Sequence, residues 1–288
     1  MSRLADLFDG KARVSPTPTL YIAEPVDNSI QFFPSDSNAV RRLVSQMAAE
    51  PNLVIITHGW LEREPWPENL ALAIKQKTDP NQWLCGWFDW HKDAALINPT
   101  GAAKFGKNTA GPLLGKKILE LSKDCPHIHL IAHSAGSWVI NEAARIVAAR
   151  TNAAIHLTFL DAYVPLFWHE ENLGDIRSDP NNSVWAEHYF TRDITLGFTE
   201  KLLTGAHNVD LTNIEPGLND HRFPFHWYHA TVLAEYATAK RYRGKALFNR
   251  AGDIEYGFAR SLEAGGSNWI LSTTLKPADK AVKIKPVR

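Results

Sequence analysis

The stretch HIHLIAHSAGSWVINEAARIV, residues 127–147, decides the fold of this chain. Its apolar first part predicts a β-strand over residues 127–132, and the spacing of apolar residues from 135 to 150 predicts a helix. Ser134 stands on the turn between them. A tight strand-to-helix turn exposes the serine hydroxyl at the sheet edge and needs small residues two positions away on either side, as Ala132 and Gly136 are. Ser134 is therefore the candidate nucleophile.

Short apolar runs alternate with helix-like segments along the chain. Strands are expected at residues 19–23, 53–57, 83–90, 127–132, 155–160 and 185–191. Helices are expected at residues 35–50, near Pro67, and at 111–123, 135–150 and 226–242. The strands up to residue 160 are nearly continuous apolar runs, which is typical of parallel strands covered on both faces. The order predicts an α/β fold with a mostly parallel, doubly wound sheet and helices on both faces.

The length of 288 residues permits one large domain. We expect this domain to occupy residues 1–245, with residues 1–15 extended, and residues 246–288 to form an appended segment rather than an independent domain. Hydrophobic residues make up 44% and charged residues 22% of the chain, which excludes a mainly disordered protein. Lys+Arg and Asp+Glu both number 31, so the charge gives no reason to expect nucleic acid as a partner.

Neither a signal peptide nor a membrane-spanning segment is recognisable. The N-terminus MSRLADLFDG carries recurring charges, and no window of about 18 residues is uniformly apolar. The only two cysteines, Cys85 and Cys125, cannot form a disulfide framework and favour a reducing compartment. The sequence predicts a cytoplasmic protein, or a secreted one if the sequence is a processed form. Transient contact with a lipid interface stays open, as does the oligomeric state.

A second motif, LVIITHGW, ends in His58-Gly59-Trp60 just past a predicted strand. Glycine lets the backbone come close to a nucleophile, so that an N–H group reaches the tetrahedral oxyanion. We expect the N–H groups of Trp60 and Ala135 to be the two donors. The helix that begins after Ala135 adds its positive N-terminal end. His58 itself fits a structural hydrogen-bonding role better than that of a base.

The acid and the base of a serine hydrolase of this fold follow the nucleophile, in that order. Asp161 and Asp193 each follow a predicted strand, at the sheet edge where ligands bind in open α/β sheets. The histidines beyond them are His207, His221, His226 and His229. His221 lies in a loop ahead of the last predicted helix, and the order Ser134, Asp161, His221 fits. Both acids remain candidates on these grounds.

Five motifs together resemble the lipases related to pancreatic lipase, within the α/β-hydrolase superfamily. They are His58-Gly59-Trp60, Phe88-Asp89-Trp90, His133-Ser134-Ala135-Gly136, Leu160-Asp161, and His221 followed seven residues later by Tyr228. The resemblance implies Ser134, Asp161 and His221 as the catalytic triad, and it favours Asp161 over Asp193. Ala162 replaces the proline that follows the acid in that family. Two cysteines cannot supply the disulfides of secreted members, and too little of this sequence follows Tyr228 for their appended β-sandwich domain, so we expect a shortened, bacterial-type relative.

Residues 177–182 (RSDPNN) are similar to the calcium-binding loop of that family. Asn182 replaces an acidic residue there, and the lost charge disfavours calcium. We therefore expect no cofactor and no metal.

The sequence thus predicts a serine hydrolase that cleaves carboxylic esters, a lipase or esterase acting on acylglycerol-like or other apolar acyl esters. A non-catalytic lipid- or ligand-binding protein on the same scaffold is the alternative, as is a thioesterase or amidase with the same triad. The chain has ten tryptophans, a residue type that both packs in hydrophobic cores and lines apolar binding clefts. Trp60, Trp138, Trp168 and Trp227 lie near proposed catalytic elements, which favours an apolar cleft. Trp83, Trp87 and Trp90 mark one strand and are expected to pack in the core.

Overall fold

The structure is a computed structural model. It describes residues 17–27, 29–47, 49–91, 98–166, 168, 173–176, 184–192, 199, 201–214, 221–233, 241–242, 245–265 and 281–284.

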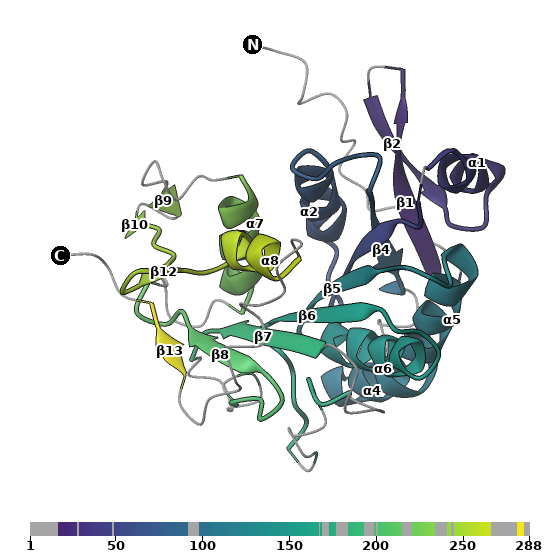
Figure 1. Cartoon of the computed structure of the whole chain (residues 1–288). Coiled ribbons are helices and arrows are strands. Elements are labelled where there is room, and N and C mark those ends of the chain that lie inside the picture. Colours follow the sequence, from purple (N-terminus) through teal and green to yellow (C-terminus); the bar gives the residue numbers. More distant parts are fainter. Residues whose placement is uncertain are drawn as a thin grey trace.

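Nine strands of the described chain form one sheet (Figure 1). In spatial order they are β13 (Val282–Lys283), β8 (His207–Asp210), β7 (Val184–Phe190), β6 (Ala154–Leu160), β5 (His127–His133), β3 (Asn52–Thr57), β4 (Trp83–Asp89), β1 (Thr19–Val26) and β2 (Ser29–Pro34). Pairing is parallel from β13 to β4 and antiparallel for β4–β1 and β1–β2. The predicted mostly parallel, doubly wound sheet is confirmed.

Helices cover both faces of this sheet. They are α1 (Asn38–Gln46), α2 (Trp66–Lys75), α4 (Pro99–Phe105), the π-helical turn η2 (Gly106–Ala110), α5 (Gly111–Leu121), α6 (Gly136–Ala148), α7 (Phe223–Val232) and α8 (Phe258–Gly265). Figure 1 shows α4, α5 and α6 on one side of the sheet and α2, α7 and α8 on the other. Each face has its own apolar core, because the strands between them are buried on both sides.

The register of the central strands brings the two chemical motifs together. In the β5–β6 ladder His133 pairs with Leu160. The next residues, Ser134 and Asp161, therefore leave neighbouring strands at the same carboxyl edge of the sheet. This is the edge at which open α/β sheets bind their ligands.

The predicted strands and the first helices are present with small shifts at their ends. Ser37 caps α1 by accepting from Val40 N, and a proline occupies the first turn of α2, as predicted. The helix predicted over residues 226–242 is wrong at both ends. Helix α7 begins at Phe223, since Pro224 suits a first turn, and it ends at Val232. Residues 241 and 242 instead form a short strand, β9 (Arg241–Tyr242), paired with β10 (Lys245–Ala246).

The C-terminal stretch contributes to the main fold at two places. Strand β13 extends the sheet, with Val282 opposite Val209 of β8. Helix α8 packs against α7, where Tyr228 donates to or accepts from Ser261 at 2.6 Å. A hairpin of β11 (Arg250–Ala251) and β12 (Ile254–Glu255) lies between α7 and α8 in the sequence.

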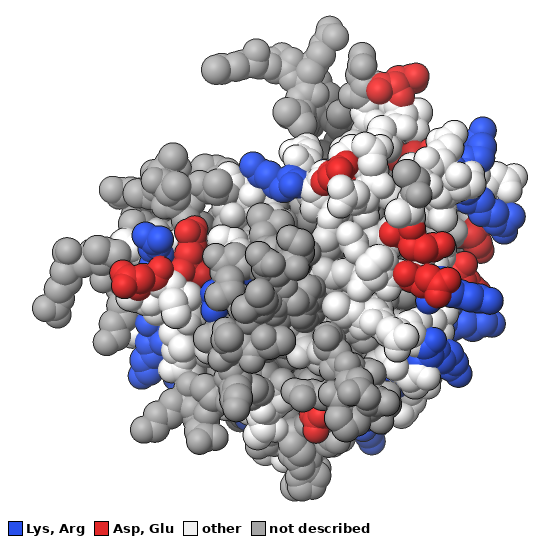
Figure 2. All heavy atoms as spheres, viewed as in Figure 1, with Lys and Arg blue, Asp and Glu red and all other residues white. Residues whose placement is uncertain are grey.

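The described surface carries no block of one charge on the face in view. Figure 2 shows basic and acidic side chains intermixed there, with neutral surface between them. This pattern agrees with the formal net charge of zero. Within the described part of the chain, no helix has the length and apolar character needed to span a bilayer.

Candidate active site

Ser134 occupies a strained backbone position between β5 and α6. Its φ of 52° lies in the left-handed region, which costs a non-glycine residue about 1 kcal/mol or more. Two hydrogen bonds hold the turn, because Ser134 N donates to Leu160 O at 3.0 Å and Tyr163 N donates to Ser134 O at 3.2 Å. The backbone of the turn is thereby fixed to the end of β6, which carries the candidate acid. A strained strand-to-helix turn of this kind is the geometry of a nucleophile elbow.

Two glycines let the turn after β3 approach Ser134. A Cβ on Gly136 would lie 2.4 Å from His58 O, and a Cβ on Gly59 would lie 2.8 Å from Ser134 Cβ. Real Cβ atoms do not approach so closely, so both positions require glycine. The small residue expected two positions after Ser134 is thus needed for contact with the His58-Gly59 turn.

Asp161 and His221 are brought together. Their Oδ2 and Nδ1 atoms lie 2.6 Å apart. The carboxylate is fully buried, and its other oxygen accepts from Thr191 N at 2.8 Å. His221 is about one-third exposed, and its ring packs on that of His133 with 4.4 Å between centroids. Because His133 directly precedes Ser134, this ring contact places His221 beside the turn that carries Ser134.

The competing candidates lie elsewhere or outside the described residues. Asp193 and the loop of residues 177–182 fall outside them. His207 lies in β8 with its ring stacked between Trp185 and Tyr256. His226 faces Glu64 at 3.7 Å, and His229 lies in the last turn of α7.

The expected oxyanion donors lie on the two segments that Gly59 and Gly136 bring together. Ala135 is the N-cap of α6, and N–H groups at a helix start have no acceptor within the helix. Trp60 lies in a turn whose next residue, Leu61, has a φ of 52°. The turn is therefore strained, and contacts around it must hold it.

A buried histidine, His58, and a partly buried one, His91, brace this turn. His58 Nδ1 contacts Gly59 O at 2.9 Å, and its Nε2 accepts from Trp90 N at 3.1 Å. Burial lowers the pKa of His58, which keeps the ring neutral. These contacts fit the structural role expected for His58. His91 Nε2 contacts the backbone oxygen of Glu62, and its Nδ1 lies 3.0 Å from Asp89.

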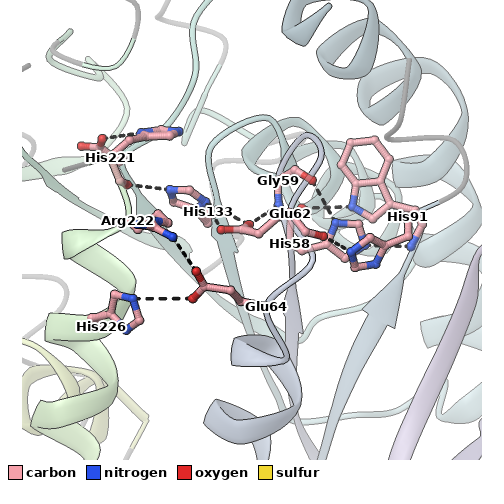
Figure 3. A network of polar contacts seen from close by, with 11 residues as sticks. His58, Gly59, Glu62, Glu64, His91, His133, His221, Arg222 and His226 are labelled. Carbon is pink, nitrogen blue, oxygen red and sulfur yellow. Dashed lines mark hydrogen bonds and ion pairs between the residues drawn. The ribbon is translucent and has the colours of Figure 1, made fainter. Parts of the chain in front are cut away.

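Sequence reasoning did not single out Glu62 or assign a role to His133. Both carboxylate oxygens of Glu62 lie 3.0 Å from His133 Nδ1, and one accepts from Gly59 N at 2.8 Å (Figure 3). His133 Nε2 contacts His221 O at 2.8 Å. The two partners of His133, Glu62 and His221, are 71 and 88 residues away from it in the chain, so no local sequence pattern links them.

Among the residues that the structure describes, two groups of side chains have the composition of a metal site. The first is His58, Asp89 and His91, and the second is His129, His156 and Glu187. In the second group His129 Nε2 bonds Thr158, and Glu187 Oε1 receives bonds from Thr158 and Ser261. The ring nitrogens of the first group also have hydrogen-bond partners. The residues of both groups thus already hydrogen-bond within polar networks of the protein.

Four tryptophans were expected near the site, and the structure separates them into two kinds. Trp138 and Trp227 are fully buried, and their Nε1 atoms donate to Tyr163 O and Phe248 O. They belong to the two cores rather than to a cleft, contrary to the expectation. Trp60 and Trp168 are only partly buried. The core role expected for the strand tryptophans is confirmed, since Trp87 and Trp90 are buried and Trp83 packs on the core.

Comparison with known proteins finds similarity to triacylglycerol lipases. The hepatic triacylglycerol lipase of Homo sapiens is 31% identical over 147 residues, which are 49% of this chain and 29% of that protein. The pancreatic triacylglycerol lipase of Myocastor coypus is 27% identical over 165 residues, or 56% of this chain and 34% of that protein. The chain thus spans about a third of the length of these relatives. No family model matches it.

Among solved structures, Thermogutta terrifontis esterase 2 phosphorylated by paraoxon is 14% identical, with 83% of this chain and 96% of that chain covered and a TM-score of 0.39. That similarity is too low to support an argument about the site. The sequence is thus similar to that of triacylglycerol lipases, and the mostly parallel sheet with helices on both faces agrees with an α/β-hydrolase fold.

Proposed function

We propose that this chain is a serine hydrolase that cleaves carboxylic esters with a triad of Ser134, His221 and Asp161. The observation that supports it most is the 2.6 Å contact between His221 Nδ1 and Asp161 Oδ2, beside a serine on a left-handed strand-to-helix turn. A serine on a strained turn, a buried carboxylate and a histidine, in this order along the chain, are the residues that an α/β-hydrolase uses for acyl transfer.

In the first half of the reaction, Ser134 Oγ attacks the ester carbonyl while His221 Nε2 takes its proton. Asp161 accepts the Nδ1–H of His221, which fixes the tautomer and stabilises the imidazolium. The bond from Thr191 N keeps the carboxylate oriented toward the ring. His221 then gives the proton to the departing alcohol, and the acyl group stays on Ser134.

The N–H groups of Trp60 and Ala135 are the proposed donors to the oxyanion that forms in this step. Donors fixed in advance cost no reorganisation when charge develops, and one such donor is worth about 10²–10³-fold in kcat. The close approach at Gly59 and Gly136 supports this assignment, because it holds the two backbone segments beside Ser134.

In the second half, water replaces the alcohol. His221 takes a proton from the water as it attacks the acyl carbonyl, and then returns that proton to Ser134 Oγ. The free acid leaves and the enzyme is regenerated. No cofactor or metal enters either half of the proposed reaction.

The substrate that we propose is a neutral ester with an apolar acyl group, of the acylglycerol type. Leu61 on the turn after Trp60 is 46% exposed, and Leu166 in the loop after Asp161 is 62% exposed. Both residues follow proposed site residues in the sequence, and apolar side chains commonly line the pockets of apolar ligands. The names of the two relatives, both triacylglycerol lipases, agree with this choice.

The test is hydrolysis of p-nitrophenyl esters of graded acyl length by the purified full chain and two serine variants. Ser134→Ala should lower turnover by about 10³-fold or more, since triad removals do so. Ser137→Ala is the matched control, because Ser137 is buried one turn further along α6 and its hydroxyl has no partner among the described residues. Equal turnover by Ser134→Ala and the wild type would contradict the proposal.

A further inference from the structure

Glu62 is a buried carboxylate that the proposed mechanism does not use. Its side chain is only 7% exposed, although it belongs to a turn at the sheet edge. Burying a carboxylate is costly unless it is paired and hydrogen-bonded. Glu62 has both kinds of partner, His133 at 3.0 Å and Gly59 N at 2.8 Å. Each of these partners adjoins a residue of the proposed site.

We infer that Glu62 and His133 are a positioning pair that holds the turn carrying Trp60 and the loop carrying His221 in place around Ser134. The inference rests on the proposed function, because it assigns these residues a task in that reaction. Neither residue touches the reacting atoms. Figure 3 shows His133 between His221 on one side and Glu62 on the other.

The charges of the pair favour this task. Burial alone would raise the pKa of Glu62, but the nearby charge of His133 and hydrogen bonds from His133 and Gly59 lower it to about 2. Burial would lower the pKa of His133, but the charge of Glu62 and its hydrogen bond outweigh burial and raise it. Each group thus shifts the pKa of the other toward its charged form.

A charged His133 is also what its two contacts require. Its Nδ1 faces a carboxylate and its Nε2 faces the carbonyl oxygen of His221, at 2.8 Å. Both of these partners are acceptors, so both ring nitrogens must carry a proton. Glu62 keeps that second proton on the ring, and the ring then donates to the backbone of the proposed catalytic base.

On its other side, Glu62 holds the strained turn. Leu61 has a φ of 52° and an exposed side chain, so apolar packing contributes little to keeping it there. The Glu62 carboxylate fixes Gly59 N, and His91 fixes the backbone oxygen of Glu62. Trp60, whose N–H is a proposed oxyanion donor, lies between these two anchors.

The test compares Glu62→Gln with Glu64→Gln as the matched control. Glu64 is a carboxylate two residues away that is 40% exposed and pairs with Arg222 at 2.6 Å. Exposed pairs contribute little, so Glu64→Gln should change kcat by less than about twofold. For Glu62→Gln we expect kcat per active site, counted by fluorophosphonate titration, to fall about 10- to 100-fold, since small misplacements cost this much. KM should stay within about threefold, because uniform substrate binding is not affected.

The pH profile separates positioning from a merely structural role. Among the described residues, the titratable groups facing His133 are Glu62 from the turn, and Asp161 and His221 from the site itself. The kcat of the wild type should fall at alkaline pH as His133 loses its proton; we call this fall the alkaline limb of the profile. Glu62→Gln should shift the alkaline limb to lower pH by about one unit or more. Glu62→Asp keeps the charge and should leave the limb closer to its wild-type position. An unchanged limb and an unchanged kcat per titrated site in Glu62→Gln would overturn the inference.

One measurement does not depend on activity. Imidazole NMR of the wild type, with the signal of His133 assigned by comparison with His133→Gln, should show a doubly protonated ring at pH 7. A neutral His133 would overturn the inference even if the esters are cleaved. Conversely, a wild type that cleaves no ester would contradict the proposed function, while a protonated ring that becomes neutral in Glu62→Gln would still support the pair.

Discussion

His221 Nδ1 and Asp161 Oδ2 lie 2.6 Å apart, although 60 residues separate them in the chain. The sheet explains how this contact forms. Asp161 leaves β6 beside the point where Ser134 leaves β5, and the loop ahead of α7 brings His221 over the same edge. The contact links the only predicted acid that lies among the described residues to one of four predicted bases.

Of the two candidate acids, we therefore expect Asp161 to be the one whose replacement by asparagine lowers kcat severely. An amide in this position favours the wrong tautomer of His221, and a change of this kind lowers kcat by about 10⁴-fold in a serine protease triad. Steady-state ester hydrolysis measures the loss. Asp193→Asn is the control, and a severe loss there with a mild one at Asp161 would assign the acid to Asp193.

Gly136→Ala should destabilise the fold, because its Cβ would lie 2.4 Å from His58 O. Overpacking of this kind costs about 1–3 kcal/mol of unfolding free energy. Gly252→Ala is an informative comparison. Nothing lies within 4 Å of the added Cβ there, and only the φ of 60° is unfavourable. Thermal unfolding should show the larger loss for Gly136→Ala, and the reverse order would contradict the close approach.

Leu166→Ser should slow the hydrolysis of long-chain esters more than that of acetate esters. Leu166 is 62% exposed in the loop after Asp161, and losing its contact with an acyl chain should lower kcat/KM for long esters about 10-fold, with acetate esters unchanged. Ile254→Ser in the β11–β12 hairpin is the control, since Ile254 is 37% exposed and lies away from the triad in sequence. An equal effect on short and long esters would argue against an acyl contact at Leu166.

Stability should decrease between about pH 6.5 and pH 4 because of buried neutral histidines. Burial lowers the pKa of His156 to about 3 and that of His188 to about 4, despite a hydrogen bond to Asn208 that raises the latter. Below pH 6.5 the unfolded chain binds protons that the folded chain does not, so the unfolding free energy falls as pH falls. Each histidine contributes a slope of up to about 1.4 kcal/mol per pH unit.

Urea unfolding at pH 7, 6 and 5 checks this slope. His188→Gln removes one titrating group, so its stability should depend less steeply on pH than that of the wild type. The same slope in both proteins would show that His188 titrates alike in the folded and unfolded chain.

The sequence predicted the nucleophile turn because its determinants are local. An apolar strand, small residues around Ser134 and a helix pattern all lie within residues 127–150. Helix α4 was missed although its signals are also local, since Asn98 caps it and Pro99 occupies its first turn. The helix predicted over residues 226–242 begins three residues earlier in the structure, at Phe223, because Pro224 favours a first helical turn.

Other features depend on contacts that no short stretch of sequence contains. Strand β13 has only two residues and exists through its pairing with β8. The Glu62–His133 contact joins positions 71 residues apart. The nearness of Trp138 and Trp227 in sequence to the site favoured a cleft, but nearness along a helix does not say which way a side chain points.

The most direct test of the account is covalent labelling of the wild type with a fluorophosphonate, followed by peptide mass spectrometry. A serine activated by His221 and Asp161 should form one adduct per chain on the peptide that contains Ser134, and ester hydrolysis should stop as labelling completes. Asp161→Asn should label far more slowly. Ester hydrolysis that persists with Ser134 fully labelled, or an adduct on another residue that stops it, would contradict the assignment of Ser134 as the nucleophile.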